Sequence, residues 1–173
     1  KKHVFLNVQV LLPKTPVVAL GKVLGIDRGI LNIAVCSDNT FFDSKHLRAV
    51  KGRYRYNRRC LLHVGTRSAH RKLRRLSGCE RRFVQDTNHC ISKAIVSKPF
   101  DVFVLEDLHI AKTKKNGKRF NCLLGSWSPS QLEDFIVYKA ENKGKIVIKI
   151  DPKYTSQRCS RCGFVNQKNR HGL

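Results

Sequence analysis

The chain opens with a stretch in which apolar and polar residues alternate, and short apolar runs bounded by turn-forming residues follow it. Residues 4–11 alternate in this way before Pro13 and Pro16, and they predict a strand that leads into the domain. Three further strands are predicted at residues 22–27, 31–36 and 40–43, with Gly29 and a Ser-Asp-Asn turn between them. Because such short connections join antiparallel neighbours, these three strands are expected to form a meander.

From residue 44 to residue 98 the pattern becomes helical. This stretch has no proline, its charges are dense, and apolar residues return at three- and four-residue spacings, as at Leu73, Leu76 and Val84. Two helices are therefore predicted, with the break between them at either Gly65 or Gly78.

The remaining pattern predicts a strand, a helix and a strand. Residues 101–106 are rich in β-formers, and residues 145–150 form another apolar run. Between them, Pro129 stands where helices often begin, with Ser128 as a candidate N-cap and an apolar stripe that continues to Gly144. The order of three strands, two helices, strand, helix and strand is that of an RNase H-like fold, an α/β fold with a mixed sheet flanked by helices.

The charge of the chain indicates what it binds. Lys and Arg number 35 against 12 Asp and Glu, a formal charge of +23 over 173 residues. A chain this basic is expected to bind a polyanion, because its self-repulsion has to be offset. No apolar run approaches the roughly 18 residues of a membrane span, so nucleic acid is the expected partner.

The cationic residues are concentrated in the predicted helices. Residues 45–82 contain 14 Lys and Arg but one acid, Glu80, and Tyr54 and Tyr56 lie among the arginines. An ordinary solvated helix would show mixed charges paired at i and i+4, a pattern that is absent here. A phosphate-binding face with strong salt dependence is predicted instead. Its candidate nucleic-acid-binding residues are Arg53, Arg55, Arg58, Arg59, Arg67, Arg71, Lys72, Arg74 and Arg75.

Two carboxylates end predicted strands. Asp27 ends the first strand of the meander and Glu106 ends the strand at 101–106. If the two strands are neighbours, these side chains converge and can bind Mg²⁺, which activates water in phosphodiester hydrolysis. Either acid alone would more simply cap a turn, but both together in so basic a chain favour the metal site. A third acid is expected to be missing, because Asp151 precedes Pro152 and indicates a turn.

The seven cysteines indicate a reducing compartment, because their number is odd and no signal-like segment opens the chain. Cys159 and Cys162 form a Cys-x-x-Cys-Gly turn that begins a zinc ribbon. A second pair should follow roughly 15 to 20 residues later, but Leu173 ends the chain first, so a longer parent protein is expected. The other cysteines are expected to be small buried or half-buried residues: Cys36, Cys60, Cys79, Cys90 and Cys122.

Four segments together strongly resemble the TnpB family, the OrfB-type proteins of insertion sequences that were long called transposases. They are Gly-Ile-Asp-Arg-Gly at 25–29, Leu-Glu-Asp-Leu at 105–108, Tyr-Lys-Ala-Glu at 138–141, and the stretch from Asp151 through Thr-Ser-Gln-Arg-Cys to Gly163. The last segment is highly specific, whereas Gly-Ile-Asp-x-Gly alone would be weak. The resemblance extends from about Lys22 to the C-terminus.

The resemblance implies an RNA-guided DNA endonuclease with a RuvC-like active site that uses Mg²⁺ or Mn²⁺. Asp27 matches the first catalytic acid and Glu106 the second, and both would bind Mg²⁺, while Cys159 and Cys162 match the first two ligands of a Zn²⁺ that the complete protein would bind. DNA and a guide RNA are the implied partners, in the cytoplasm or nucleoid of the cell. The family's N-terminal RNA-binding region, its second cysteine pair and its third acid have no match here, so the isolated chain is expected to bind metal weakly and to cleave little.

Three regions are thus expected: a leading strand at 1–21, a RuvC/RNase H-like nuclease core at 22–152 with a basic helical insertion at about 44–98, and a truncated zinc ribbon at 153–173. Two other functions are compatible with the same residues. One is a catalytically inactive relative that only binds nucleic acid, and the other is a DDE-type DNA transposase, which the zinc-ribbon segment fits less well. The oligomeric state is left open.

Overall fold

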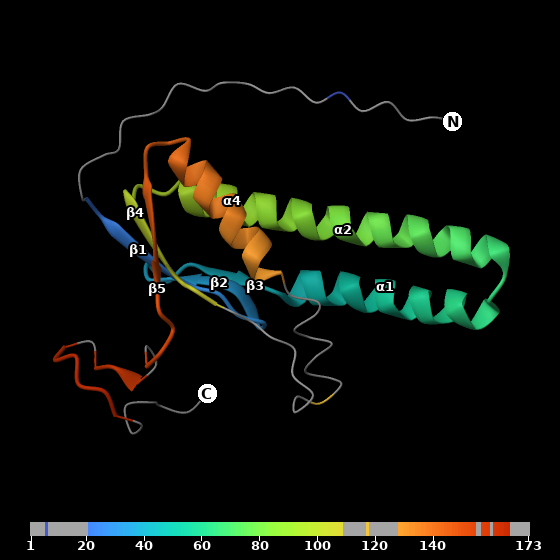
Figure 1. Cartoon of the computed structure of the whole chain (residues 1–173), viewed down its shortest axis with the longest axis horizontal. Coiled ribbons are helices and arrows are strands. Elements are labelled where there is room, and N and C mark those ends of the chain that lie inside the picture. Colours follow the sequence, from blue (N-terminus) through green and yellow to red (C-terminus); the bar gives the residue numbers. More distant parts are fainter. Residues whose placement is uncertain are drawn as a thin grey trace.

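The computed structural model describes residues 6, 21–108, 117, 128–154, 157–159 and 161–166. The strand predicted at 4–11, and with it nearly all of the 1–21 region, lies outside the described residues, as does Cys122. The elements along the chain are β1 (Val23–Asp27), β2 (Asn32–Cys36), β3 (Phe41–Asp43), α1 (Lys45–Val64), α2 (Arg67–Val96), β4 (Val102–Glu106), α4 (Pro129–Glu141) and β5 (Ile146–Ile150), as Figure 1 shows.

The five strands form one mixed sheet in the order β3-β2-β1-β4-β5. β1 pairs antiparallel with β2, and β2 pairs antiparallel with β3, so the predicted meander is confirmed. β4 pairs parallel with both β1 and β5, after crossovers through the helices. This is the RNase H-like arrangement that the element order predicted, and it makes β1 and β4 neighbours.

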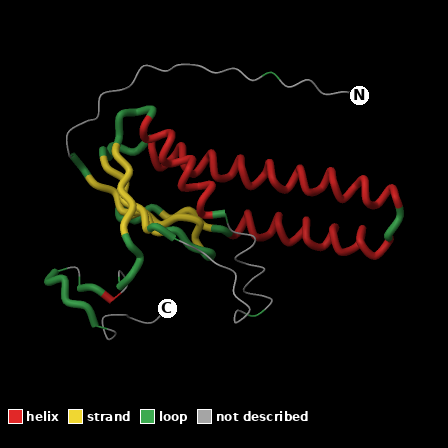
Figure 2. The backbone as a smooth tube through the Cα atoms, viewed as in Figure 1, coloured by secondary structure: helices red, strands yellow, loops and turns green. Residues whose placement is uncertain are grey.

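The core lies between the sheet and the two helices α2 and α4, which cover the same face (Figures 1 and 2). Leu24 and Ile26 of β1 and Phe103 and Leu105 of β4 are buried against these helices. Because side chains alternate along a strand, the residues between them belong to the other face of the sheet. The alternation therefore directs Asp27 away from the core.

The break between the two long helices falls at Gly65, one of the two predicted positions. Gly65 takes a left-handed conformation, with φ of 65°, and its N–H donates to the Leu61 carbonyl, which ends α1. Thr66 then caps α2, since its hydroxyl accepts a hydrogen bond of 3.2 Å from the Ala69 N–H. Gly78, the alternative break, lies inside α2.

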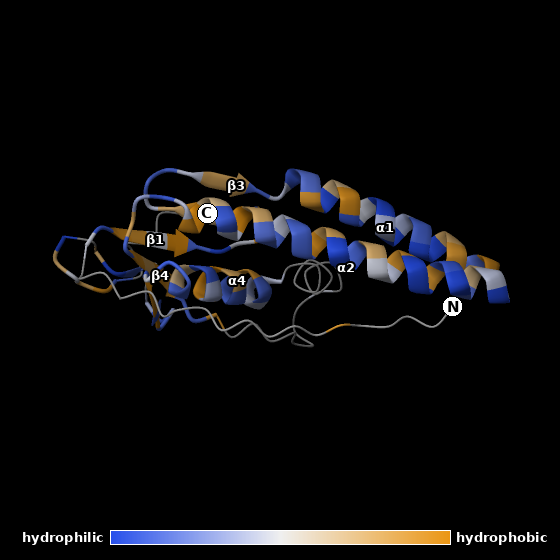
Figure 3. Cartoon of the chain, turned by 90° about the horizontal axis from the view of Figure 1, so that it is seen from above, coloured by the Kyte–Doolittle hydropathy of each residue, from blue (hydrophilic) through white to orange (hydrophobic). Residues whose placement is uncertain are grey.

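The hairpin of α1 and the first half of α2 extends well beyond the sheet, as Figure 1 shows. Figure 3 shows hydrophilic residues recurring along both helices out to the turn that joins them. Buried residues of α2 are concentrated in its second half, from Asn88 to Val96, which packs on the sheet. The described part of the predicted insertion is therefore a largely exposed helical hairpin built on a short buried base.

One expectation from the sequence is confirmed only in position, and another was wrong. Ser128 occupies the N-cap position of α4, but its side chain makes no capping hydrogen bond; its hydroxyl accepts one of 3.1 Å from the Asn88 amide instead. Cys36 is buried as expected, whereas Cys60, Cys79 and Cys90 are exposed, because their positions on α1 and α2 face away from the core.

Among the helices that the structure describes, we find none with the length and apolar character of a membrane span.

Candidate active site and nucleic-acid interface

The two predicted acids end neighbouring parallel strands at matching positions. Gly25 pairs with Val104 and Ile26 with Leu105, so the next step of the register sets Asp27 opposite Glu106. On the two strands that flank this pair, Val35 of β2 pairs with Asp27 and Ile150 of β5 pairs with Glu106. The parallel pairing of β1 with β4 therefore brings the two acids to the same edge of the sheet and to the same face.

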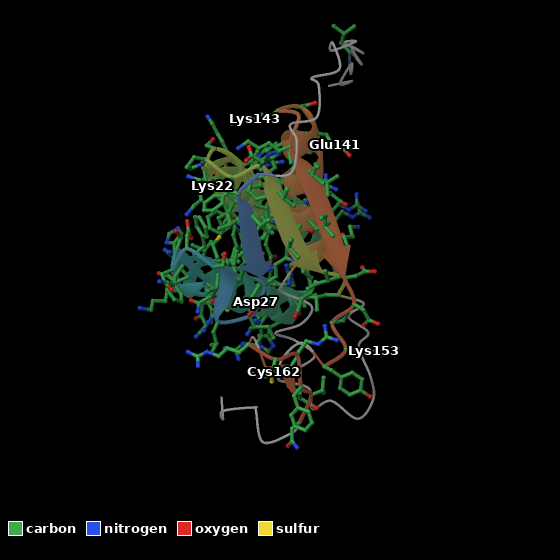
Figure 4. All side chains as sticks on the ribbon, turned by 90° about the vertical axis from the view of Figure 1, so that its left-hand side faces the viewer. Lys22, Asp27, Glu141, Lys143, Lys153 and Cys162 are labelled. Carbon is green, nitrogen blue, oxygen red and sulfur yellow. The ribbon has the colours of Figure 1, made fainter. Side chains whose placement is uncertain are left out.

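A cavity of about 310 Å³ lies on this face, at the carboxyl end of the strands. Asp27 is exposed, Glu106 is half-buried, and both line this cavity. Figure 4 shows Asp27 at the far end of β1 from Lys22. The remaining lining residues come from β1, β2 and β4, from the residue after β2 and from the end of β5: Gly25, Ile26, Val35, Cys36, Ser37, Val104 and Ile150.

Arg28 follows Asp27 in the chain but points into the opposite side of the sheet. Its side chain is buried, with 1% of its surface exposed. Its Nη1 donates to the carbonyl of Pro129 at 2.9 Å and to the Glu133 carboxylate at 2.7 Å, both on α4. Its Nη2 donates to the backbone carbonyl of Glu106. One guanidinium thus joins the ends of β1 and β4 to the start of α4.

Glu133 is itself shared between two cations. Besides Arg28, its carboxylate pairs with Lys149 of β5. Burial by itself would raise the pKa of Glu133, but the hydrogen bonds from Lys149 and Arg28 outweigh it, so this pKa lies below its ordinary value. Glu133 is therefore a carboxylate held in its charged form beneath the candidate active site.

Sequence reasoning overlooked Arg28 and Glu133, although both left a signal. Neighbouring residues of an extended chain point to opposite faces of the sheet, so Arg28 points to the buried face if Asp27 points to the open one. A buried arginine needs a charged or polar partner on that face. Glu133 lies on the apolar stripe of α4, between buried Leu132 and Ile136. A charge at such a position on a helix predicts an ion pair with the element that it covers.

Among the described residues, Asp27 and Glu106 are the acids that line the cavity, and no third acid lines it with them. Asp151 follows β5, and its carboxylate accepts a 2.9 Å hydrogen bond from the Lys153 N–H, which is the turn that the sequence predicted. Asp107 follows Glu106, and its N–H donates to the Ile150 carbonyl. Over the described residues, no cluster of three or more His, Cys, Asp or Glu side chains could hold a metal ion.

Backbone hydrogen bonds close the turn that contains Cys159 and Cys162. The Cys159 N–H donates to the Phe164 carbonyl at 2.8 Å, the Gly163 N–H donates to the Cys159 carbonyl at 2.9 Å, and Arg158 bridges to Val165. Hydrogen bonds from the Cys162 backbone, and then from the Arg161 backbone, lower the pKa of the Cys159 thiol. The turn follows β5, and Figure 4 shows Cys162 beyond the end of the sheet where Asp27 lies.

The predicted nucleic-acid-binding residues all lie on the hairpin, and most are exposed. Arg53, Arg55 and Arg59 are exposed on α1, as are Arg67, Arg71, Lys72, Arg74 and Arg75 on α2. Arg58 differs, because it is half-buried and pairs with Glu80 across the hairpin. Lys51 also pairs with Glu80, at 3.9 Å. The one acid between residues 45 and 82 therefore joins α1 to α2.

An aromatic ring and cations meet in a groove between α1 and α2. Tyr56 of α1 lines a cavity of about 450 Å³ together with Lys72 and Arg75 of α2. Arg59 lies over the Tyr56 ring, 5.6 Å from its centroid. Tyr56 is 60% exposed, so its ring is available to a ligand in this groove. Such a combination suits a sugar-phosphate chain with a base stacked on the ring.

Comparison with known proteins identifies the family. Residues 6–117 match the family model OrfB_IS605, described as "Probable transposase", and residues 130–172 match the model of the Cas12f1-like TNB domain. The chain belongs to the TnpB family. A CRISPR-associated endodeoxyribonuclease, Cas12f1 of Sulfoacidibacillus thermotolerans, is 32% identical over 92% of this chain and 42% of its own length. The TnpB-like protein MJ0751 of Methanocaldococcus jannaschii is 38% identical over 53% of this chain and 34% of its own length.

The fold of this TnpB-family chain is shared with a solved Cas12f1 structure. That structure, a cryo-EM complex of Cas12f1 with sgRNA and target DNA, superimposes with a TM-score of 0.64 at 22% identity. The match covers 83% of this chain and 39% of the Cas12f1 chain. The chain thus spans less than half the length of these relatives.

Proposed function

We propose that this TnpB-family chain is the nuclease core of an RNA-guided DNA endonuclease that hydrolyses phosphodiesters with the help of a divalent metal ion. The observation that supports this most directly is the register of β1 and β4, which sets Asp27 and Glu106 opposite each other at a cavity. Family membership adds support, since the Cas12f1 relative is named an endodeoxyribonuclease. A solved Cas12f1 chain of the same fold is in complex with sgRNA and target DNA.

The two carboxylates fit a hard divalent cation. Their oxygens are the ligands that Mg²⁺ and Mn²⁺ prefer, and the parallel strands hold them on one open face. A bound ion would supply an activated water and charge stabilisation at the leaving oxygen. With two acids in the described part of the site, we expect the isolated chain to bind metal weakly and to cleave little, and the full-length protein to cleave well.

The hairpin would hold the nucleic acid. Its exposed arginines provide bidentate phosphate donors, and the groove beside Tyr56 adds a stacking surface. Such contacts favour a role in holding the strands by their backbone while the guide RNA selects the sequence.

The cysteine turn would provide half of a zinc site. Cys159 and Cys162 lie in the cysteine turn described above, in which backbone hydrogen bonds favour a thiolate at Cys159. Two further ligands would complete a tetrahedral Zn²⁺ site. A structural zinc there would hold the segment that follows β5.

The test is cleavage by the full-length protein with its guide RNA, a matched DNA and Mg²⁺. Asp27→Ala and Glu106→Gln should each lower the cleavage rate by more than about a hundredfold, since even outer residues of a metal site affect activity by roughly 10- to 100-fold. Binding of the DNA should survive both changes, because the phosphate contacts lie on the hairpin.

Asp86→Asn is the matched control, because it also removes one exposed acid, on α2 away from the cavity. It should leave cleavage unchanged. Full cleavage by Asp27→Ala would refute the proposed site. DNA binding without cleavage by the unaltered protein would instead favour the inactive nucleic-acid-binding relative, and strand-joining products would favour a DDE-type transposase.

A further inference from the structure

The cluster of Arg28, Glu133 and Lys149 lies directly beneath the candidate active site, and the chemistry of nucleases does not by itself require it. Arg28 and Glu133 are 4% and 9% exposed. A buried ion pair contributes little net stability, because desolvation of both charges offsets their attraction. The Arg28 Nε is also buried without a hydrogen-bond partner in the described structure, which is a further energetic cost. Stability alone is therefore a poor explanation for an arginine at this position.

The contacts of Arg28 have a specific geometric effect on the two acids. Arg28 is bonded through the main chain to Asp27, so anchoring its side chain on one face of the sheet fixes the backbone from which Asp27 projects on the other face. The same guanidinium binds the carbonyl of Glu106 itself. The backbone at both acids is thus held by one rigid, planar guanidinium group.

The cluster also fixes this end of the sheet against α4. Arg28 binds the carbonyl of Pro129, the first residue of α4, and Glu133 one turn later. Glu133 in turn pairs with Lys149, which is paired in the sheet with Leu105, next to Glu106. Four elements, β1, β4, β5 and α4, therefore meet at the Arg28 and Glu133 side chains.

We propose that Arg28, held by Glu133, is a positioning residue that sets the separation of the Asp27 and Glu106 carboxylates for the metal ion. The proposal rests on the proposed function, because it assumes that these two acids bind the metal. Lysine at position 28 would keep the charge but would lose the planar fork that reaches Glu133 and both carbonyls at once.

The experiment measures Mn²⁺ affinity directly in the full-length protein without nucleic acid, by electron paramagnetic resonance, and the thermal midpoint of unfolding in parallel. Arg28→Lys should weaken Mn²⁺ binding by about 10-fold or more, in the range found for groups that orient metal ligands. The metal concentration for half-maximal cleavage should rise by a similar factor, while DNA affinity stays unchanged.

Lys145→Met is the matched control for a purely structural effect. Lys145 is likewise a partly buried cation that holds two carbonyls, those of Val96 and Lys98 at 2.8 and 2.7 Å, but at the opposite end of β5. Its loss should lower the unfolding midpoint and leave Mn²⁺ affinity within about twofold of the unaltered protein.

The outcomes separate the two proposals. If Mn²⁺ binding depends on Asp27 but is the same in Arg28→Lys, or if Lys145→Met weakens it equally, the positioning role is refuted and the metal site stands. If Asp27→Ala binds Mn²⁺ as tightly as the unaltered protein, or if neither binds it, the proposed metal site is refuted and so is the positioning role of Arg28. Should Arg28→Lys fail to fold, Glu133→Gln keeps the arginine while removing its charged partner, and unchanged Mn²⁺ affinity there would also refute the proposal.

Discussion

At the scale of single residues, the charged cluster of Arg28, Glu133 and Lys149 has effects that differ from those of the two acids at the cavity, Asp27 and Glu106. Asp27 and Glu106 line a cavity, whereas Glu133 is enclosed between two cations. A buried carboxylate of this kind contributes to stability only while it is charged. Its contribution is therefore measurable as a dependence of stability on pH.

Glu133→Gln is expected to lower the free energy of unfolding by about 3 kcal/mol at neutral pH, because it leaves Arg28 buried without its charged partner. The pKa of Glu133 in the folded protein is lower than its ordinary value of 4.5, so the carboxylate stabilises the fold above that value. This stabilisation is lost as the pH falls through the folded pKa. The difference between the two proteins should therefore shrink on acidification.

Urea unfolding of both proteins from about pH 7 to pH 3 measures this difference. Glu141→Gln is the control, since Glu141 is exposed at the end of α4 and its loss should have little effect at any pH. A difference for Glu133→Gln that stays constant over the whole range would contradict the assignment of a charged Glu133.

At the scale of elements, the hairpin depends on one glycine and not on another. Gly65→Ala should destabilise the protein by about 1 kcal/mol, because an L side chain is strained at a φ of 65°. Gly78→Ala should stabilise it by about 0.5 to 1 kcal/mol, because alanine is favoured inside a helix and the new Cβ would meet only the end of Arg82, at 3.5 Å. Thermal or urea unfolding of the two variants measures both changes in stability. Equal changes for Gly65→Ala and Gly78→Ala would show that the helices are not divided at Gly65.

We expect the hairpin also to set the salt dependence of nucleic-acid binding. Replacing Arg71 and Arg74 with alanine should reduce the slope of log affinity against log salt by about 2, since each phosphate contact contributes about 0.9. Binding should weaken to a similar extent for all DNA sequences, because phosphate contacts do not distinguish bases. Fluorescence anisotropy over a series of salt concentrations measures the slope.

Two cations at the other end of the sheet provide the control for this prediction. Lys22 and Lys143 are exposed and lie away from the Asp27 end, as Figure 4 shows. Replacing both with alanine changes the net charge equally and should leave the slope nearly unchanged. Equal slopes for the two double variants would show that the hairpin acts only through overall charge.

At the scale of the whole molecule, the sheet and the cysteine turn are expected to be stabilised separately. The sheet is held by its own core, whereas the turn of Cys159 and Cys162 is short and exposed or half-exposed, and small segments of this kind depend on a metal. In the full-length protein, Cys159→Ser and Cys162→Ser should each remove one equivalent of zinc, measured by mass spectrometry of the metal. The thermal unfolding of the core should change little.

Cys60→Ser is the matched control for the zinc prediction, since Cys60 is also an exposed cysteine but lies on α1. It should retain the zinc. A full equivalent of zinc in Cys159→Ser would show that the metal is bound elsewhere.

Local patterns were sufficient to predict most of the elements. Short apolar runs between turn residues located all five described strands to within about a residue. Helical spacing located α1 and α2, and Ser128, Pro129 and the apolar stripe after them located α4. Choosing between Gly65 and Gly78 was not possible from the pattern alone, because glycine is tolerated inside a helix when its neighbours pack. The expected burial of Cys60, Cys79 and Cys90 was wrong, because burial depends on which face of a helix meets the sheet.

The sequence by itself determined the candidate acids and cations of the site, since Asp27, Glu106 and the arginines of the hairpin could be selected from their positions in predicted elements. Only the tertiary structure decided how they meet. The parallel pairing of β1 with β4 sets Asp27 opposite Glu106, although 79 residues separate them in the chain. The partners of Arg28 come from α4 and β4, and a contact across that separation depends on the packing of the whole sheet, which no local pattern specifies.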